Sequence, residues 1–205
     1  MKKEGGRGGY NELTPTFGGE VELIEVEAKV PITEEEKSRI LEKLKTLCPP
    51  ERIYEGEEED LFFVSSYDDS FGADKTLKLR RSNDGAKLIF KSKRVHGGLK
   101  ENFEIEVRIK EGDEDNLLRL LRSLGFRESV VVKKKRLSFR VDECTVNVDD
   151  VIGLGSFLEV EVLASEDSVD GAHDKVLGML SALGLSHKRA THKSYAEMIA
   201  VQEVW

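Results

Sequence analysis

Charged and apolar residues alternate one by one along many short segments of this chain, and this alternation restricts the fold more than any other feature. The segment Glu25-Val26-Glu27-Ala28-Lys29 is the clearest case. Alternate side chains of a β-strand point to the same face of the sheet, so two carboxylates and one ammonium share one face here. Such a face can hold a divalent metal and an anion at the same time.

The alternation recurs along the chain and predicts about eight strands. Each strand has a charged face and an apolar face, as in an antiparallel sheet with one polar side. Few helices intervene, so we expect an α+β fold. The expected strands are Val21–Val30, Leu61–Ser66, Thr76–Arg81, Ala86–Lys93, Phe103–Ile109, Val130–Val141, Thr145–Asp149 and Ser156–Leu163.

Four segments have the spacing of helices. Thr33, followed by Glu36 three residues later, forms a capping-box pattern at the start of the first. The helices need an apolar surface to cover, so they should pack on the apolar faces of the strands and leave the charged faces pointing away. The expected helices are Thr33–Leu47, Asp113–Leu124, Ser168–Leu183 and Ser194–Val201.

Composition limits the class of protein. The chain has 205 residues, of which 35% are charged, and a net charge of -8. This balance argues against a protein that coats nucleic acid with a basic surface. No apolar run reaches transmembrane length and the N-terminus lacks the apolar core of a signal peptide, so we expect a cytoplasmic protein without a membrane partner.

The ends and the cysteines give further expectations. Residues 1–19 are rich in glycine and lack periodicity, which predicts a flexible tail before a single domain over residues 20–202. Cys48 and Cys144 lack metal-type spacing, so we expect two buried thiols. The histidines His96, His173, His187 and His192 share no ligand spacing and should be solvated or in loops, and the acidic run Glu57–Asp60 should begin in a solvated loop.

The charged faces of all strands, taken together, favour a tunnel. A solvated sheet face explains any one strand, but exposed ion pairs contribute only about 0–1 kcal/mol each. Stability alone is therefore a weak reason for a chain to keep so many paired charges. If the sheet closes into an eight-stranded antiparallel barrel with this face inward, the charges line its interior. A dry, empty interior of this kind would be costly, whereas bound metal ions and a polyphosphate would satisfy both signs of charge.

An ordered series of motifs resembles the CYTH superfamily of triphosphate tunnel metalloenzymes, and class IV adenylate cyclase-like proteins within it most of all. The likeness covers about Val21 to Val201. Asn102 stands where the family often has Arg, and Lys78 replaces an Arg, which keeps the charge and loses the bidentate fork. The motifs are Glu25-x-Glu27-x-Lys29, Asp60-Leu61-Phe62-Phe63, Leu77-Lys78-Leu79-Arg80, Ile89-Phe90-Lys91, Lys134-Lys135-Arg136, Val148-Asp149, Gly153-Leu154-Gly155, Glu159-Val160-Glu161 and Lys193-Ser194-Tyr195.

The resemblance implies roles for particular residues. It implies Mg²⁺ or Mn²⁺ as cofactor, with metal ligands Glu25, Glu27, Asp149, Glu159 and Glu161 and with Glu104 and Glu106 as additional candidates. It implies triphosphate binding by Lys29, Lys78, Arg80, Lys91, Lys134, Arg136 and Lys193. Glu25, Glu27 and Lys29 are the expected catalytic residues.

The resemblance also implies an enzyme that acts on a small-molecule triphosphate, and the charges alone do not decide which bond breaks. We place conversion of ATP to cyclic AMP and pyrophosphate first. Hydrolysis of tripolyphosphate, thiamine triphosphate or a nucleoside triphosphate is the alternative. A polyphosphate- or nucleotide-binding module without turnover is the second alternative. A homodimer is plausible for a small barrel.

Overall fold

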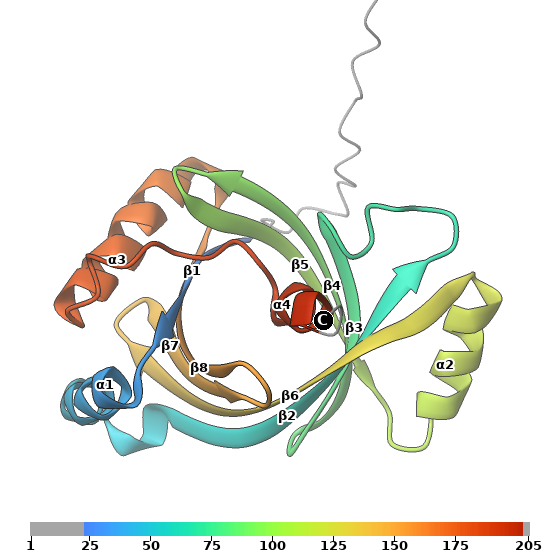
Figure 1. The fold of residues 1–205 in the computed structure, drawn as a ribbon, viewed down its shortest axis with the longest axis horizontal. Helices are drawn as coiled ribbons and strands as arrows, with labels where there is room; N and C mark the ends of the chain where they lie inside the picture. The colour runs from blue at the N-terminus through green and yellow to red at the C-terminus, as the bar shows by residue number, and fades with distance from the viewer. Residues whose placement is uncertain (1–22, 203–205) are drawn as a thin grey trace, which may run out of the picture.

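Eight antiparallel strands close into a barrel in the computed structural model, which describes residues 23–202 (Figure 1). The expected α+β fold with a closed antiparallel barrel is confirmed. The expected tail, residues 1–19, lies outside the described residues. Around the ring the strands follow the order β1-β5-β4-β3-β2-β6-β7-β8. Their bounds are β1 Ile24–Ile32, β2 Ile53–Ser65, β3 Lys75–Ser82, β4 Gly85–His96, β5 Leu99–Ile109, β6 Phe126–Val141, β7 Cys144–Val151 and β8 Gly155–Ala164.

Three helices cover the outside of the barrel, as the apolar strand faces predicted (Figure 1). Ile40 and Leu44 of α1 and Val176 of α3 join one core with the outward residues of β1, β7 and β8. On the other side, Leu121 of α2 packs with Leu79 and its neighbours on β2 and β3. The helices are α1 Glu34–Leu47, α2 Glu114–Ser123, α3 Val169–Ala182 and α4 Tyr195–Gln202, and short 3₁₀ turns cover Pro50–Arg52 and Glu166–Ser168.

The expected capping box starts α1. The backbone N–H of Glu36 donates to the Thr33 hydroxyl at 3.2 Å, and the Thr33 N–H donates to the Glu36 carboxylate at 2.8 Å. Both bonds satisfy backbone donors that the first helical turn leaves free. The helix therefore begins where the sequence predicted.

The fourth helix departs from the expectation that all helices pack outside. Figure 1 shows α4 within the ring of strands. Tyr195 packs in an apolar cluster with Phe157, Val132 and Val151, and the rings of Tyr195 and Phe157 lie 5.2 Å apart. Most residues of α4 are apolar, so no side of the helix requires water. Its side chains fill part of the lumen.

Strand β2 begins earlier than expected and includes the acidic run. Glu58 and Asp60 are buried and Glu57 is exposed, so the run alternates between the lumen and the outside. The expected solvated loop is therefore wrong. Polar residues on both faces hide the alternation of hydrophobicity by which strands are recognised.

Two smaller expectations concern cysteines and membranes. Cys48 and Cys144 are both unpaired and buried, as predicted. Within residues 23–202, no helix has the length and apolar character needed to span a membrane.

Candidate functional site

The barrel encloses a cavity of about 760 Å³ whose wall receives side chains from every strand. The volume is within the roughly 300–1,000 Å³ usual for small-molecule sites. The charged face of each strand points into this cavity, as the alternation predicted. Predicted site residues in its lining are Glu25, Glu27, Lys29, Lys78, Arg80, Lys91, Glu104, Glu106, Lys134, Arg136, Glu159 and Glu161.

Pairing of the first and last strands sets the charge pattern on one wall. Glu27 of β1 lies opposite Glu161 of β8, and Lys29 lies opposite Glu159. The Lys29 ammonium contacts Glu159 at 2.7 Å. Like charges directly opposite each other destabilise a sheet, and Glu161 faces the carboxylate of Glu27 where Glu159 faces an ammonium.

Glu25, Glu27 and Glu161 form a carboxylate cluster. One oxygen of each lies within 4.8 Å of the others. Burial, and then the charge of Glu25, raise the pKa of Glu161 to about 8. Burial is the largest influence on Glu27 as well, but Lys100 and Lys29 overcome it and hold its pKa at about 2. When Glu161 is ionised, the cluster therefore holds a negative charge that one more positive charge would compensate.

The donor set of this cluster fits a hard divalent cation. Carboxylate oxygens are the ligands that Mg²⁺ and Mn²⁺ prefer. The Asn102 side-chain amide donates to Glu25 at 3.1 Å and to Glu27 at 3.0 Å, which orients both carboxylates. Glu161 makes no ion pair with any residue from 23 to 202. A cation bound there would offset the cost of burying the negative charge of this unpaired carboxylate.

The other two expected metal ligands lie apart from the cluster and are bound to cations. Asp149 accepts two hydrogen bonds from Arg136, at 2.7 and 2.6 Å. Glu159 contacts both Lys29 and Arg136. The structure therefore brings together three of the five expected metal ligands and places the remaining two among the cations.

The expected additional carboxylates are also paired. Glu104 contacts Lys91, which contacts Glu25 at 2.6 Å as well. Glu106 contacts Lys87 at 2.7 Å. Lys91 thus lies at the carboxylate cluster, and two carboxylates already pair with it.

A second group of cations gathers around Asp60. Arg80 donates to both oxygens of Asp60, at 2.7 and 2.8 Å, and Lys78 donates to it at 2.9 Å. Burial, and then the nearby Arg80, lower the pKa of Lys78 to about 8. One carboxylate therefore pairs with two cations, and Lys78 makes one hydrogen bond to it where Arg80 makes two.

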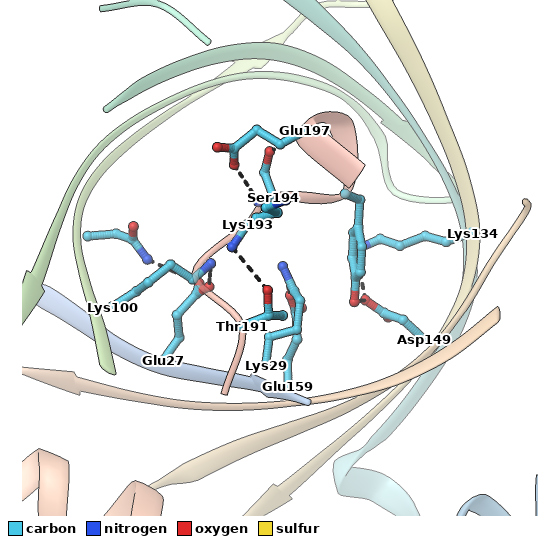
Figure 2. Close-up of polar contacts among 12 residues, drawn as sticks. Glu27, Lys29, Lys100, Lys134, Asp149, Glu159, Thr191, Lys193, Ser194 and Glu197 are labelled. Carbon is cyan, nitrogen blue, oxygen red and sulfur yellow. Dashed lines mark hydrogen bonds and ion pairs between the residues drawn. The ribbon is translucent and has the colours of Figure 1, made fainter. Parts of the chain in front are cut away.

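Tyr195 joins α4 to the cations of β1 and β6. Its hydroxyl donates to Asp149 at 2.9 Å. The ammonium of Lys29 lies 4.0 Å from the centre of the ring, and that of Lys134 lies 5.3 Å from it. Figure 2 shows Lys134 and Asp149 on one wall of the lumen and the pair Lys29–Glu159 beside them, and the contacts of Tyr195 link these two groups.

The segment before α4 crosses the lumen (Figure 2). The Thr191 N–H donates to the backbone carbonyl of Lys29 at 2.8 Å, which fixes the segment to β1. Ser194 and Tyr195 line the cavity, but Lys193 is exposed and outside its lining. The structure does not bring Lys193 together with the other expected phosphate ligands.

Several lumen residues were absent from the predicted site. Lys100 contacts Glu27, and Glu58 contacts both Arg80 and Lys134 at 3.2 Å. Asp60 and Tyr195 stand in motifs that carried the resemblance, so the sequence held a signal for them. Lys100 is followed by a glutamate and an asparagine, and this unbroken polar run hides the face to which it belongs.

Comparison with known proteins gives a consistent family. The profile described as CYTH domain matches residues 23–195. A Methanocaldococcus jannaschii protein named "Putative adenylate cyclase MJ0240" is 30% identical over 177 residues, which cover 86% of this chain and 98% of that protein.

Solved structures extend the likeness. The PH1819 protein of Pyrococcus horikoshii OT3 is 30% identical, with a TM-score of 0.75, and the match covers 87% of this chain and 99% of that one. A Hippeastrum protein described as "Putative adenylyl cyclase HpAC1", with a dominant triphosphatase activity, has a TM-score of 0.62 at 17% identity. That match covers 89% of this chain and 95% of the Hippeastrum chain, and it shows a shared fold.

Proposed function

Because the chain belongs to the CYTH family, we propose that its lumen binds the triphosphate of a small molecule together with Mg²⁺ or Mn²⁺ and catalyses breakage of a phosphorus–oxygen bond. One observation carries this proposal: a carboxylate cluster and a group of buried cations face the same cavity. A pure anion site would not place carboxylates beside its ligand. A pure metal site would not need the cations.

We assign the metal to Glu25, Glu27 and Glu161. A divalent cation bound there would neutralise phosphate charge and lower the pKa of an attacking hydroxyl or water. Asn102 orients two of the three carboxylates through its amide. Asp149 and Glu159 then act by positioning Arg136.

We assign the phosphate oxygens to Lys78, Arg80, Lys134 and Arg136. Phosphoryl transfer depends mainly on placement and on neutralisation of charge, and positively charged N–H donors form short, strong hydrogen bonds to phosphate oxygens. Burial opposes protonation of Lys29, but Glu159 and Glu27 outweigh it and raise the pKa of this lysine. Lys29 therefore supplies positive charge and does not act as a base.

Cyclisation of ATP is the first candidate reaction, since the relative in Methanocaldococcus is named as an adenylate cyclase. In it the ribose 3′-oxygen attacks the α-phosphorus, the bond to the β-phosphate oxygen breaks, and pyrophosphate leaves.

Hydrolysis of a triphosphate is the second candidate, and the aromatic rings favour it. Lysines already lie near the faces of Tyr195 and Phe62, with Lys78 5.6 Å from the Phe62 centre. Rings covered in this way are not free to stack an adenine base. A water molecule that attacks the terminal phosphorus needs no base-binding site.

Product analysis tests the proposal. The full chain is incubated with ATP or tripolyphosphate and Mg²⁺ or Mn²⁺, and the products are separated by chromatography. Cyclic AMP with pyrophosphate indicates the cyclase, and orthophosphate with a diphosphate indicates the hydrolase. Metal-dependent binding without turnover of any triphosphate contradicts both and supports a binding module.

A matched pair of variants links the activity to the lumen. Lys78→Met should lower turnover by at least about tenfold, because a charged hydrogen bond to substrate is worth about 1.5–3 kcal/mol. Lys135→Met is the control, since Lys135 lies on β6 with an exposed side chain that contacts Glu57. Equal activity of both variants would remove Lys78 from the site.

A further inference from the structure

Two histidines and a glutamate converge outside the lumen, between the β4–β5 hairpin and α3. His96 ends β4, Glu101 lies on β5 and His173 lies on α3. One possible ligand atom of each lies within 4.8 Å of the others. Figure 1 shows the β4–β5 hairpin reaching the side of the barrel on which α3 packs. None of these residues takes part in the lumen chemistry.

Glu101 is the fixed centre of this group. Its side chain is 1% exposed, and it points away from the lumen that Lys100 and Asn102 line. Its Oε1 atom lies 3.2 Å from Nδ1 of His96 and 3.0 Å from Nε2 of His173. Arg94 donates to the other oxygen. One carboxylate oxygen therefore faces both imidazoles while the other is held in place.

The hairpin turn is shaped to admit the His173 ring. Gly97 has a φ of +58°, and a Cβ atom there would lie 3.1 Å from Nδ1 of His173. A side chain at this position would have both an unfavourable backbone conformation and a close contact with the imidazole. The glycine therefore permits the approach of α3 to the hairpin at this point.

We propose that His96, Glu101 and His173 bind a divalent transition-metal ion, and that zinc suits them best. Imidazole nitrogen and carboxylate oxygen are common zinc ligands, and two His with one Glu is a known three-ligand zinc set. Ligand atoms around one tetrahedral zinc lie about 3.3 Å apart. The two contacts to Glu101, at 3.2 and 3.0 Å, are already close to that spacing.

The site is half open. The His173 side chain is 12% exposed and that of His96 is 67% exposed, so His96 has room to turn toward a metal and water can take the fourth position. Arg94 plays the part of an outer-shell partner that orients a ligating carboxylate. The bound ion would join α3 to the β4–β5 hairpin, two elements that are otherwise distant in the sequence.

The proposal is tested by titrating zinc into the metal-free full chain in excess Mg²⁺ and measuring the binding by calorimetry. Mg²⁺ binds oxygen ligands and competes for the lumen but poorly for imidazole. We expect one zinc per chain. His173→Ala should lower the affinity by about 100-fold or more, because loss of even an outer-shell partner costs about 10–100-fold. His187→Ala, at an exposed turn, is the matched control and should bind as the wild type does.

Two further measurements keep the outcomes distinct. Co²⁺ bound to imidazole in a four-coordinate site has a visible absorption spectrum, which should appear in the wild type and be lost in Glu101→Gln. Triphosphate turnover with Mg²⁺ should be unchanged in His173→Ala. Zinc binding that survives His173→Ala but disappears in Glu161→Gln would place the ion in the lumen and overturn the proposal, as would the absence of zinc binding.

Discussion

Asp60 shows how one residue can leave another ready for a ligand. Its carboxylate accepts two hydrogen bonds from Arg80 and one from Lys78. Arg80 holds both oxygens of Asp60, so Lys78 shares its one carboxylate with a second cation and remains a buried cation whose charge is only partly compensated. A phosphate oxygen would supply what Lys78 lacks.

This arrangement predicts a pH dependence for triphosphate binding. The pKa of Lys78 is about 8 in the folded protein, below its ordinary value of 10.5. Lys78 should therefore lose its proton as the pH rises above about 8, and binding of tripolyphosphate should weaken. Lys78→Arg should remove this step, because arginine stays protonated. Dissociation constants at pH 7, 8 and 9 for both proteins would test it, and parallel curves would contradict it.

The lowered pKa of Lys78 also makes the stability of the fold depend on pH. Between pH 8 and 10.5 the unfolded chain binds more protons at Lys78 than the folded chain does, so the contribution of this residue to stability rises with pH in that window. Below pH 8 the charged lysine has a constant cost, which a bound phosphate would offset.

Glu161 predicts a separation of metal binding from stability. Its pKa of about 8 means that it is mostly protonated at pH 7 without metal. Glu161→Gln resembles this protonated form, so the free energy of unfolding of the metal-free protein should stay within about 1 kcal/mol of wild type. Mg²⁺ or Mn²⁺ affinity should fall at least about tenfold, since a ligating oxygen is replaced. Calorimetry and urea unfolding measure the two effects.

Glu27→Gln provides the contrast. Glu27 is buried and contacts Lys100, and removal of one partner of a buried ion pair costs about 3–5 kcal/mol. This variant should lose stability as well as metal affinity. Equal unfolding midpoints for the two variants would contradict the assignment of Glu161 as the unpaired member of the cluster.

At the scale of elements, α4 is the part of the fold that the sequence predicted least well. Its existence was expected from the pattern after Ser194, but its place within the ring was not. A short, mostly apolar helix has no polar face to show which side is buried. The contacts that place it, such as Tyr195 with Phe157 and Asp149, join distant parts of the chain, so local pattern does not predict them.

Strand alternation was the more reliable guide. It placed the charged faces of the strands on one side, and the closed barrel puts that side inward. It failed where polar residues occur on both faces, as in β2 around Glu57 and in β5 around Glu101. Each of those places has a buried carboxylate, Glu58 or Glu101, whose partners lie on other strands or on α3. The spacing of residues along one strand does not reveal such partners.

Tyr195 gives a prediction for α4. Tyr195→Phe removes one hydrogen bond to Asp149, which keeps Arg136 and Lys134 as partners, so it should cost about 1 kcal/mol. Tyr195→Ala also removes the ring from the apolar cluster and should cost about 3–5 kcal/mol. It should also release α4, which limited proteolysis would detect as faster cleavage near the C-terminus. Equal cleavage of both variants would contradict this anchoring role.

At the scale of the whole molecule, the charged side chains of the lumen largely compensate one another. Many of its cations are paired with its carboxylates, such as Lys29 with Glu159 and Lys91 with Glu25. A metal ion and a triphosphate would each replace one half of these pairs. Either ligand alone would leave charges of one sign unpaired in a buried place, which is costly.

Metal and triphosphate should therefore bind cooperatively. We expect each to raise the affinity of the other by about 5–150-fold, the usual range of coupling between two sites. Calorimetric titration of a non-hydrolysable triphosphate, with Mg²⁺ and with a chelator, measures this factor. Independent binding would contradict the view that the two ligands divide the lumen charges between them.

The closed ring also has a consequence for how the protein forms. Strand β1 pairs with β5 and with β8, and Ile24 lies opposite Ala164. The barrel cannot close until its last strand has been synthesised, so we expect hairpins such as β6–β7 to fold early and the seam between β1 and β8 to form late. Pulse-labelled hydrogen exchange during refolding should protect the amides of β1 last. The lumen would thus form in the final folding step, and its charged side chains would be brought together at that step.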